Sequence, residues 1–126
     1  MTKTAFLFAG QGAQYLGMGR DLYDRYPIVK ETIDQASQVL GYDLRDLIDK
    51  EETKLNQTRY TQPAILATSV AIYRLLKEKG YQPDMVAGLS LGEYSALVAS
   101  GALDFEDAVA LVAKRGAYME EAAPAG

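Results

Sequence analysis

The sequence predicts an α/β fold in which parallel strands are joined by helical crossovers. Two short apolar segments have the character of strands, helical patterns fill the segments between and after them, and a glycine-flanked turn joins the second strand to a helix. With 126 residues, the chain has at most the length of a single domain. Its composition, 48% hydrophobic and 24% charged, is that of an ordinary globular protein.

The first predicted element is a strand over residues 4–8, a short apolar segment that Gly10 stops. We expect this strand to be buried and parallel to its neighbour. The sequence GQGAQYLGMG that follows predicts a loop. Its glycines do not match a dinucleotide-binding fingerprint, because Tyr15 stands where the third glycine would be, and no Gly-Lys-Ser/Thr indicates a phosphate loop.

Three helical segments are expected next. Asp21 starts the first, and Pro27 begins the second, for which Gly41 provides a C-terminal cap. Asp43 is placed to cap a short third helix that runs through Leu47.

Residues 50–60 predict a solvated connection, and residues 61–79 predict the longest helix of the chain. Thr61 is the candidate cap of this helix, Pro63 fits its first turn, and Gly80 ends it. Apolar side chains cover a wide arc of the helix, as expected for a helix packed on a sheet.

A second strand over residues 85–87 leads through a tight turn at 88–92 into a helix over 91–99. Asp104 then predicts the cap of a last helix, which runs to about Ala122. Only two strands are predicted, and a two-stranded sheet is marginally stable alone. We therefore expect the chain to be part of a larger domain, and the ending EEAAPAG supports this because it resembles a helix that continues into a linker.

Charge and composition argue against several classes of function. Thirteen Lys and Arg against 17 Asp and Glu give a formal charge of −4, which disfavours binding to nucleic acid. The chain has neither cysteine nor histidine, so we expect no disulfide and no metal site. No apolar segment approaches the length of a membrane span, and residues 5–10 are too short for a signal-peptide core. We expect a cytoplasmic location and no membrane association.

The segment VAGLSLGEYSAL contains the pattern Gly-x-Ser-x-Gly, with Ser90 between Gly88 and Gly92. In a nucleophile elbow, a strand enters so tight a turn that the serine is strained and its hydroxyl projects above the sheet. A helix that follows such a serine directs its N-terminus at the reaction centre, where the backbone N–H of Leu91 would stabilise an oxyanion. The alternative is a strand–turn–helix junction whose glycines serve packing alone.

Gln11 follows the first strand in the glycine-rich loop. The ends of parallel strands open on the same edge of a sheet, so Gln11 and Ser90 are candidates to share one crevice. An uncharged amide is a plausible hydrogen-bond donor to an oxyanion. The alternative is a turn with solvated glutamines.

Arg115 stands out on a helical wheel of the last helix. It falls inside a broad apolar arc, between Leu111 and Tyr118 and beside Val112. A charge in such a position needs a carboxylate partner or a cleft. One interpretation is a bidentate clamp for a substrate carboxylate; the other is a snorkelling side chain or a structural ion pair.

Three segments occur in order over almost the whole chain: FAGQGAQYLGMG, TQPAILATSVAIYRLL and GLSLGEYSALVASGALDFEDAVALVAKRG. Together they resemble the N-terminal portion of the malonyl-CoA:acyl-carrier-protein transacylases of bacterial fatty-acid synthesis. The resemblance implies an α/β-hydrolase-like core that is truncated. Residues 1–126 would be the N-terminal part of the acyltransferase domain, without its ferredoxin-like subdomain and C-terminal part.

The resemblance also implies a mechanism. Ser90 would attack the thioester of malonyl-CoA and hold the malonyl group as an ester, and the phosphopantetheine thiol of acyl carrier protein would then take it. The Leu91 N–H and the Gln11 region would form the oxyanion hole, and Arg115 would bind the free malonyl carboxylate. Gln62 matches a motif residue near the site. No cofactor is implied, and the partners would be malonyl-CoA, acyl carrier protein and the missing C-terminal part of the same enzyme.

Two features depart from the family's pattern. Leu89, which would line the site, stands where the commonest motif has histidine. The family's catalytic histidine lies downstream of the matching segment, and a serine without an adjacent base is a poor nucleophile. We therefore expect this polypeptide alone to have little or no transferase turnover. Two other functions stay open: a serine esterase that uses the same elbow, and a non-catalytic module that folds or pairs with another chain.

Overall fold

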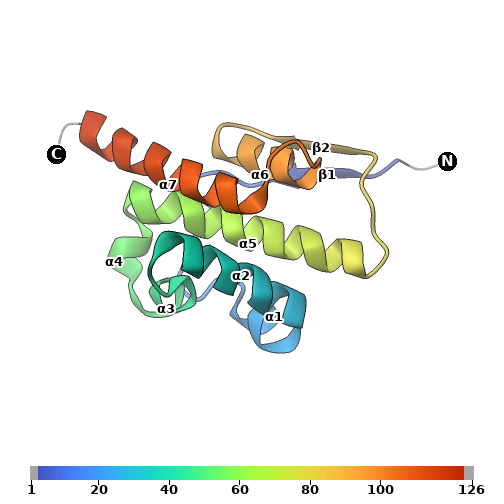
Figure 1. Ribbon diagram of the computed structural model, residues 1–126, viewed down its shortest axis with the longest axis horizontal. Helices are drawn as coiled ribbons and strands as arrows, with labels where there is room; N and C mark the ends of the chain where they lie inside the picture. The colour runs from blue at the N-terminus through green and yellow to red at the C-terminus, as the bar shows by residue number, and fades with distance from the viewer. Residues whose placement is uncertain (1–2, 124–126) are drawn as a thin grey trace.

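The computed structural model describes residues 3–123 of the chain (Figure 1). Within this range the elements are β1 (Ala5–Phe8), α1 (Arg20–Arg25), α2 (Pro27–Leu40), α3 (Leu44–Lys50), α4 (Glu52–Leu55), α5 (Thr58–Glu78), β2 (Met85–Gly88), α6 (Leu91–Ala99) and α7 (Phe105–Ala122). The two strands are parallel, so the predicted α/β class with helical crossovers is confirmed. The linker expected at the end of the chain falls on residues 124–126, outside the described residues.

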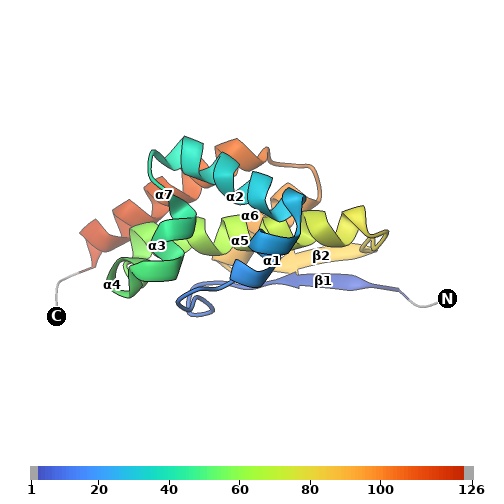
Figure 2. The ribbon, with the colours of Figure 1, turned by 90° about the horizontal axis from the view of Figure 1, so that it is seen from below.

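The helices lie over one face of the sheet. Figure 2 shows the two strands along one side of the molecule, α5 next to them, and α2 and α7 beyond α5. Helix α5 contacts α2, α4, α6 and α7, and Figure 1 shows α7 running alongside it. This central helix therefore packs against four other helices, including α6, which contacts both strands, and α7, the last helix of the chain.

The hydrophobic core lies mainly among the helices. Its largest fully buried apolar side chains come from α2 to α7: Ile33, Leu44, Ile48, Leu55, Leu66, Val70, Leu91, Val109 and Val112. Burial of each such side chain contributes about 1.5–3 kcal/mol before the entropy cost of ordering is subtracted. This packing fixes α5, α6 and α7 relative to one another. No helix within residues 3–123 is long and apolar enough to cross a lipid bilayer.

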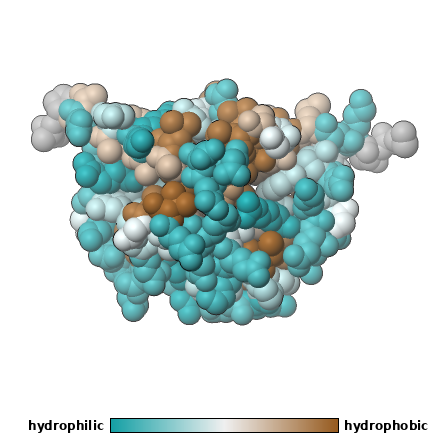
Figure 3. Space-filling model, in the orientation of Figure 1, coloured by the Kyte–Doolittle hydropathy of each residue, from teal (hydrophilic) through white to brown (hydrophobic). Residues whose placement is uncertain are grey.

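The expectation that the first strand is buried is wrong. Phe6 and Phe8 point toward α5, where their rings meet the ring of Tyr73 with centroids 6.1 and 6.3 Å apart. Leu7 points the other way and is 81% exposed, and Met85 in β2 is 60% exposed. The reason is that the described helices cover only one face of the sheet, whereas an apolar strand is buried only when both faces are covered. Figure 3 shows further hydrophobic side chains on the surface over α6.

Most helix ends occur at the predicted residues. Helix α2 begins at Pro27 and ends at Gly41, whose φ of 82° is in the left-handed region. Asp43 and Asp104 each accept a hydrogen bond from the backbone N–H three residues later, at the starts of α3 and α7. These caps fix where α3 and α7 begin, and Arg115 lies in α7.

The solvated connection predicted over residues 50–60 is largely exposed, as expected, but it contains helix α4 and the start of α5. Leu55 is fully buried at the end of α4, and α5 already begins at Thr58. Thr61 therefore lies inside α5 and does not cap it, because its hydroxyl donates to the backbone carbonyl of Leu55. The earlier start makes Gln62 a buried residue of the helix interior.

Candidate active site

Ser90 lies on the turn between β2 and α6. Its backbone has φ 56° and ψ −116°, and within residues 3–123 no other residue besides glycine has a positive φ. Such a conformation strains a residue that has a Cβ, and it persists only where the surrounding structure enforces it. The predicted strand, tight turn and helix are all present, so the local geometry expected of an elbow is confirmed.

The two glycines beside Ser90 allow close contacts between backbones. A Cβ on Gly88 would overlap the backbone of Gly92, and a Cβ on Gly92 would overlap the carbonyl oxygen of Phe8 at the end of β1. These neighbours are backbone atoms of packed elements, so they cannot move aside without displacing a strand or a helix. The glycines thus bring α6 against the end of the sheet and leave Ser90 and Leu89 exposed on the turn.

The guanidinium of Arg115 lies directly beside Ser90. Its Nη2 donates a hydrogen bond to Ser90 Oγ over 2.9 Å, and its Nη1 donates to Gln62 Oε1 over 2.8 Å. The guanidinium carbon also lies 5.4 Å from the centre of the Tyr94 ring. The structure therefore brings together three predicted site residues from α5, α7 and the turn before α6.

Arg115 forms no salt bridge with any carboxylate among residues 3–123. In contrast, Arg20, Arg45 and Arg59 each pair with an aspartate or a glutamate. A guanidinium has five N–H groups, and two of those of Arg115 are used in the bonds to Ser90 and Gln62. The sequence also allowed a structural ion pair for Arg115, and residues 3–123 contain none. Three of its N–H groups remain for another acceptor.

The apolar arc around Arg115 is only partly covered. Val112 is buried, but Leu111 is 44% exposed and Tyr118 is 68% exposed. With Lys114, Arg115, Met119 and Ala122, the two exposed side chains line an open depression of about 460 Å³. The guanidinium is therefore half-buried at the border of a surface depression, where a dissolved ligand can reach it.

Gln11 and Leu91 lie on either side of the turn. A Cβ on Gly10 would be 3.5 Å from the carbonyl oxygen of Leu89, so the first loop runs next to the elbow. The side-chain amide of Gln11 donates to Thr58 Oγ1 over 3.2 Å, so this amide is already engaged. The backbone N–H groups of Gln11 and Leu91 donate no hydrogen bond to any group within residues 3–123. The backbone of Gln11, rather than its side chain, is thus the available donor.

Helix α3 fixes the far end of the first loop. The buried guanidinium of Arg45 donates to the backbone carbonyl of Met18 over 2.7 Å and pairs with Asp49 over 2.6 Å. Burial raises the pKa of the Asp49 carboxyl, but hydrogen bonds from Arg45 and Arg20 outweigh this effect, and the pKa lies below its usual value. The loop that carries Gln11 is therefore held by an ionised network and not only by its own turns.

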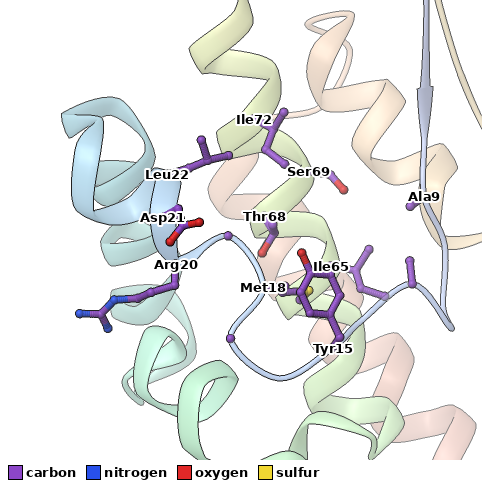
Figure 4. Close-up of a pocket in the computed structure, with 13 residues that line it drawn as sticks. Ala9, Tyr15, Met18, Arg20, Asp21, Leu22, Ile65, Thr68, Ser69 and Ile72 are labelled. Atoms are coloured by element: carbon purple, nitrogen blue, oxygen red, sulfur yellow. The ribbon is translucent and has the colours of Figure 1, made fainter.

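A separate cavity of about 480 Å³ lies between the first loop and α5 (Figure 4). Figure 4 shows Tyr15 and Met18 from the loop facing Thr68 and Ile65 from the helix. The Thr68 hydroxyl is buried and has no hydrogen-bond partner within residues 3–123. Ser90 does not line this cavity, so the cavity is distinct from the elbow. No group of three or more potential metal-ligating side chains occurs within the described part of the chain.

Two residues that contact the site were not predicted from the sequence. Tyr94 contacts Arg115, and Thr58 accepts a hydrogen bond from Gln11. Tyr94 follows Ser90 by four positions at the start of α6, and this spacing places both on one side of a helix. That spacing was a usable signal for Tyr94. Thr58 gave no such signal, because its segment was predicted to be a solvated connection.

The fold and the turn define an α/β protein with a strained serine at a strand-to-helix elbow. The family described as "Acyl transferase domain" matches residues 5–126, and the chain belongs to this family. The malonyl CoA-acyl carrier protein transacylase of Bacillus subtilis (strain 168) is 52% identical over 127 aligned positions, which cover 100% of this chain and 40% of the relative. The enzyme of the same name from Escherichia coli (strain K12) is 53% identical over 128 positions, covering 100% and 41%.

Solved structures agree with this assignment. The crystal structure of MCAT from Streptococcus pneumoniae has 94% identity and a TM-score of 0.95, covering 97% of this chain and 40% of that chain. The malonyl CoA-acyl carrier protein transacylase from Coxiella burnetii has 52% identity and a TM-score of 0.96, covering 99% and 40%. The predicted resemblance is confirmed, and the chain spans about 40% of the length of these relatives.

Proposed function

We propose that this chain carries the nucleophile and the carboxylate-binding group of a malonyl-CoA:acyl-carrier-protein transacylase of fatty-acid synthesis in the cytoplasm. The observation that supports this most strongly is the pair formed by the strained Ser90 and Arg115, with Nη2 2.9 Å from Oγ and no carboxylate bonded to the guanidinium within residues 3–123. A hydroxyl that reacts with an acyl group and a cation beside it suit an acyl group with a free carboxylate at its other end.

In the proposed reaction, Ser90 Oγ attacks the thioester carbon of malonyl-CoA. The C–O bond forms, the C–S bond breaks, and CoA leaves as its thiol with the proton that the serine gives up. The phosphopantetheine thiol of acyl carrier protein then attacks the malonyl-serine ester and returns the proton to Ser90. The backbone N–H groups of Gln11 and Leu91 would stabilise the oxyanion of both steps. The reaction requires no cofactor.

Arg115 would change partners during substrate binding. A carboxylate accepts stronger hydrogen bonds from a guanidinium than a neutral hydroxyl does. The malonyl carboxylate would therefore displace Ser90 Oγ from Nη2 and release the hydroxyl toward the thioester. Leu89, which is 87% exposed beside Ser90, would line the entrance and leave the nucleophile in place.

The proton of Ser90 needs an acceptor that residues 3–123 do not provide near Oγ, because the hydroxyl's hydrogen-bond partner there is the cation of Arg115. We propose that the family's catalytic histidine, which lies downstream of the matching segment, takes this proton. On this proposal, residues 1–126 form the N-terminal part of an α/β-hydrolase-like core and have little or no transferase turnover by themselves.

The test uses a fused enzyme in which residues 1–126 replace the matching part of the Streptococcus pneumoniae enzyme, which is 94% identical over that part. We expect transfer of malonyl from malonyl-CoA to phosphopantetheinylated acyl carrier protein, and loss of transfer in Ser90→Ala. A folded fused enzyme without transfer would contradict the proposal. Faster hydrolysis of neutral esters than malonyl transfer would favour a serine esterase, and absence of both reactions would favour a non-catalytic module.

A further inference from the structure

We propose that Gln62 is a positioning residue that orients the Arg115 guanidinium without neutralising it, and that it thereby sets the preference for acyl groups with a free carboxylate. This inference rests on the proposed function, because it concerns how the same site recognises its substrate. It assigns a role in specificity to a buried amide that the family resemblance places near the site without a defined role.

The Gln62 side chain is held in one orientation. It is fully buried in α5, its Oε1 accepts from Arg115 Nη1 over 2.8 Å, and its Nε2 lies 3.0 Å from Met119 Sδ. A reversed amide would place an NH₂ donor against a guanidinium donor and leave the carbonyl oxygen unsatisfied in the interior. The carbonyl oxygen is therefore fixed toward Arg115.

The two hydrogen bonds that the Arg115 guanidinium donates differ in how readily they can break. Ser90 is exposed on the turn, and its bond to Nη2 must break when the hydroxyl attacks a substrate. Gln62 is fully buried and bonded to Nη1, and on this proposal it keeps that bond while substrate binds. The Tyr94 ring restricts the guanidinium from one face but does not fix its rotation within the plane. Gln62 thus keeps the guanidinium oriented while Ser90 is replaced by the substrate carboxylate, which reduces the entropy cost of that step.

The neutrality of Gln62 matters as much as its position. Arg20, Arg45 and Arg59 are each held by a carboxylate, which satisfies the charge as well as the hydrogen bonds. A glutamate at position 62 would have nearly the same shape as glutamine but would compete with the substrate carboxylate for the same cation. An amide oxygen fixes the geometry and leaves the positive charge for the ligand.

The test compares three variants of the fused enzyme by kcat/KM with malonyl-CoA and with acetyl-CoA. Gln62→Leu should lower the ratio of malonyl to acetyl use about tenfold, because a charged hydrogen bond that orients the cation is lost. Gln62→Glu should lower it at least as much, because the cation is neutralised. Gln35→Leu is the matched control: Gln35 accepts a hydrogen bond from Arg74 over 3.2 Å, outside the site, and its loss should leave the ratio unchanged.

A second measurement on the 126-residue chain separates positioning from recognition. Arginine-selective ¹⁵N NMR reports rotation about the Nε–Cζ bond of Arg115, which should be slow in the wild type and in Gln62→Glu and fast in Gln62→Leu. If the unaltered fused enzyme transfers no malonyl, the proposed function fails, and the NMR still decides whether Gln62 orients Arg115. An unchanged ratio in Gln62→Leu, or unchanged rotation, overturns the inference. If that variant does not fold, a wild-type ratio in Gln62→Glu overturns it.

Discussion

Gly116, which follows Arg115 in α7, packs directly on the start of α5. A Cβ at this position would lie 2.7 Å from the carbonyl oxygen of Thr58 and 2.8 Å from the Cα of Arg59. Both are backbone atoms, so an added methyl group can be accommodated only if one helix moves. We predict that Gly116→Ala destabilises the protein and displaces Arg115 from Gln62.

Two opposing effects set the size of this loss. Alanine is favoured over glycine inside a helix by about 1 kcal/mol. Overpacking of a well-packed interior costs about 1–3 kcal/mol, and the upper part of that range applies because two contacts fall below the approach distance that real Cβ atoms show. The net expectation is a decrease of about 1–2 kcal/mol in the free energy of unfolding.

Urea unfolding of the chain, followed by helical circular dichroism, measures this decrease. With a slope of about 1–3 kcal/mol per molar urea, the midpoint should fall by roughly 0.3–2 M. Ala117→Gly, at the next position of the same helix, is the control: it should destabilise by about 1 kcal/mol through helix propensity alone. A Gly116→Ala protein as stable as the wild type, or more stable, would refute the close packing of α7 on α5.

Three further predictions concern the site and its support. In the fused enzyme, Arg115→Ala should reduce malonyl-CoA use at least about tenfold more than acetyl-CoA use, because only malonyl has a carboxylate to bind; equal losses would make Arg115 structural. Thr58→Val should release the Gln11 side chain and slow both transfers to a similar extent, and a selective loss of malonyl transfer would contradict this role. The pKa of Asp49 is lower in the folded protein than its unfolded value of 3.8, so its ion pairs contribute stability that is present above that pH and lost as the pH falls through the folded pKa. Thermal unfolding should therefore show a smaller loss of stability between about pH 5 and about pH 3 in Asp49→Asn than in the wild type, and an equal loss would contradict the network with Arg45.

Local sequence signals were enough to predict the helix ends that are fixed by capping and the turn that is fixed by close backbone packing. Asp43, Asp104 and Gly41 mark helix ends because each satisfies backbone groups at its own position. The glycines on either side of Ser90 likewise indicate a tight turn, because a Cβ at either position would overlap backbone atoms. These elements could be predicted because their causes lie within a few residues of one another.

Features that depend on distant packing could not be predicted in the same way. Leu55 is buried because α5 and α3 surround a short helix that has no periodic pattern of its own. The exposure of Leu7 depends on which face of the sheet the helices cover. The contact of Gln62 with Arg115 joins residues 53 positions apart. One signal for it was present in the sequence: Gln62, like Arg115, is a polar residue among the apolar side chains of a helix.

The most direct test of the central claim is peptide mapping by mass spectrometry after the fused enzyme is incubated with malonyl-CoA without carrier protein and quenched in acid. The proposed mechanism predicts a malonyl ester on Ser90, lost in Ser90→Ala and discharged when acyl carrier protein is added before quenching. A malonyl group on any other residue, or no covalent adduct in an enzyme that still transfers malonyl, would contradict it.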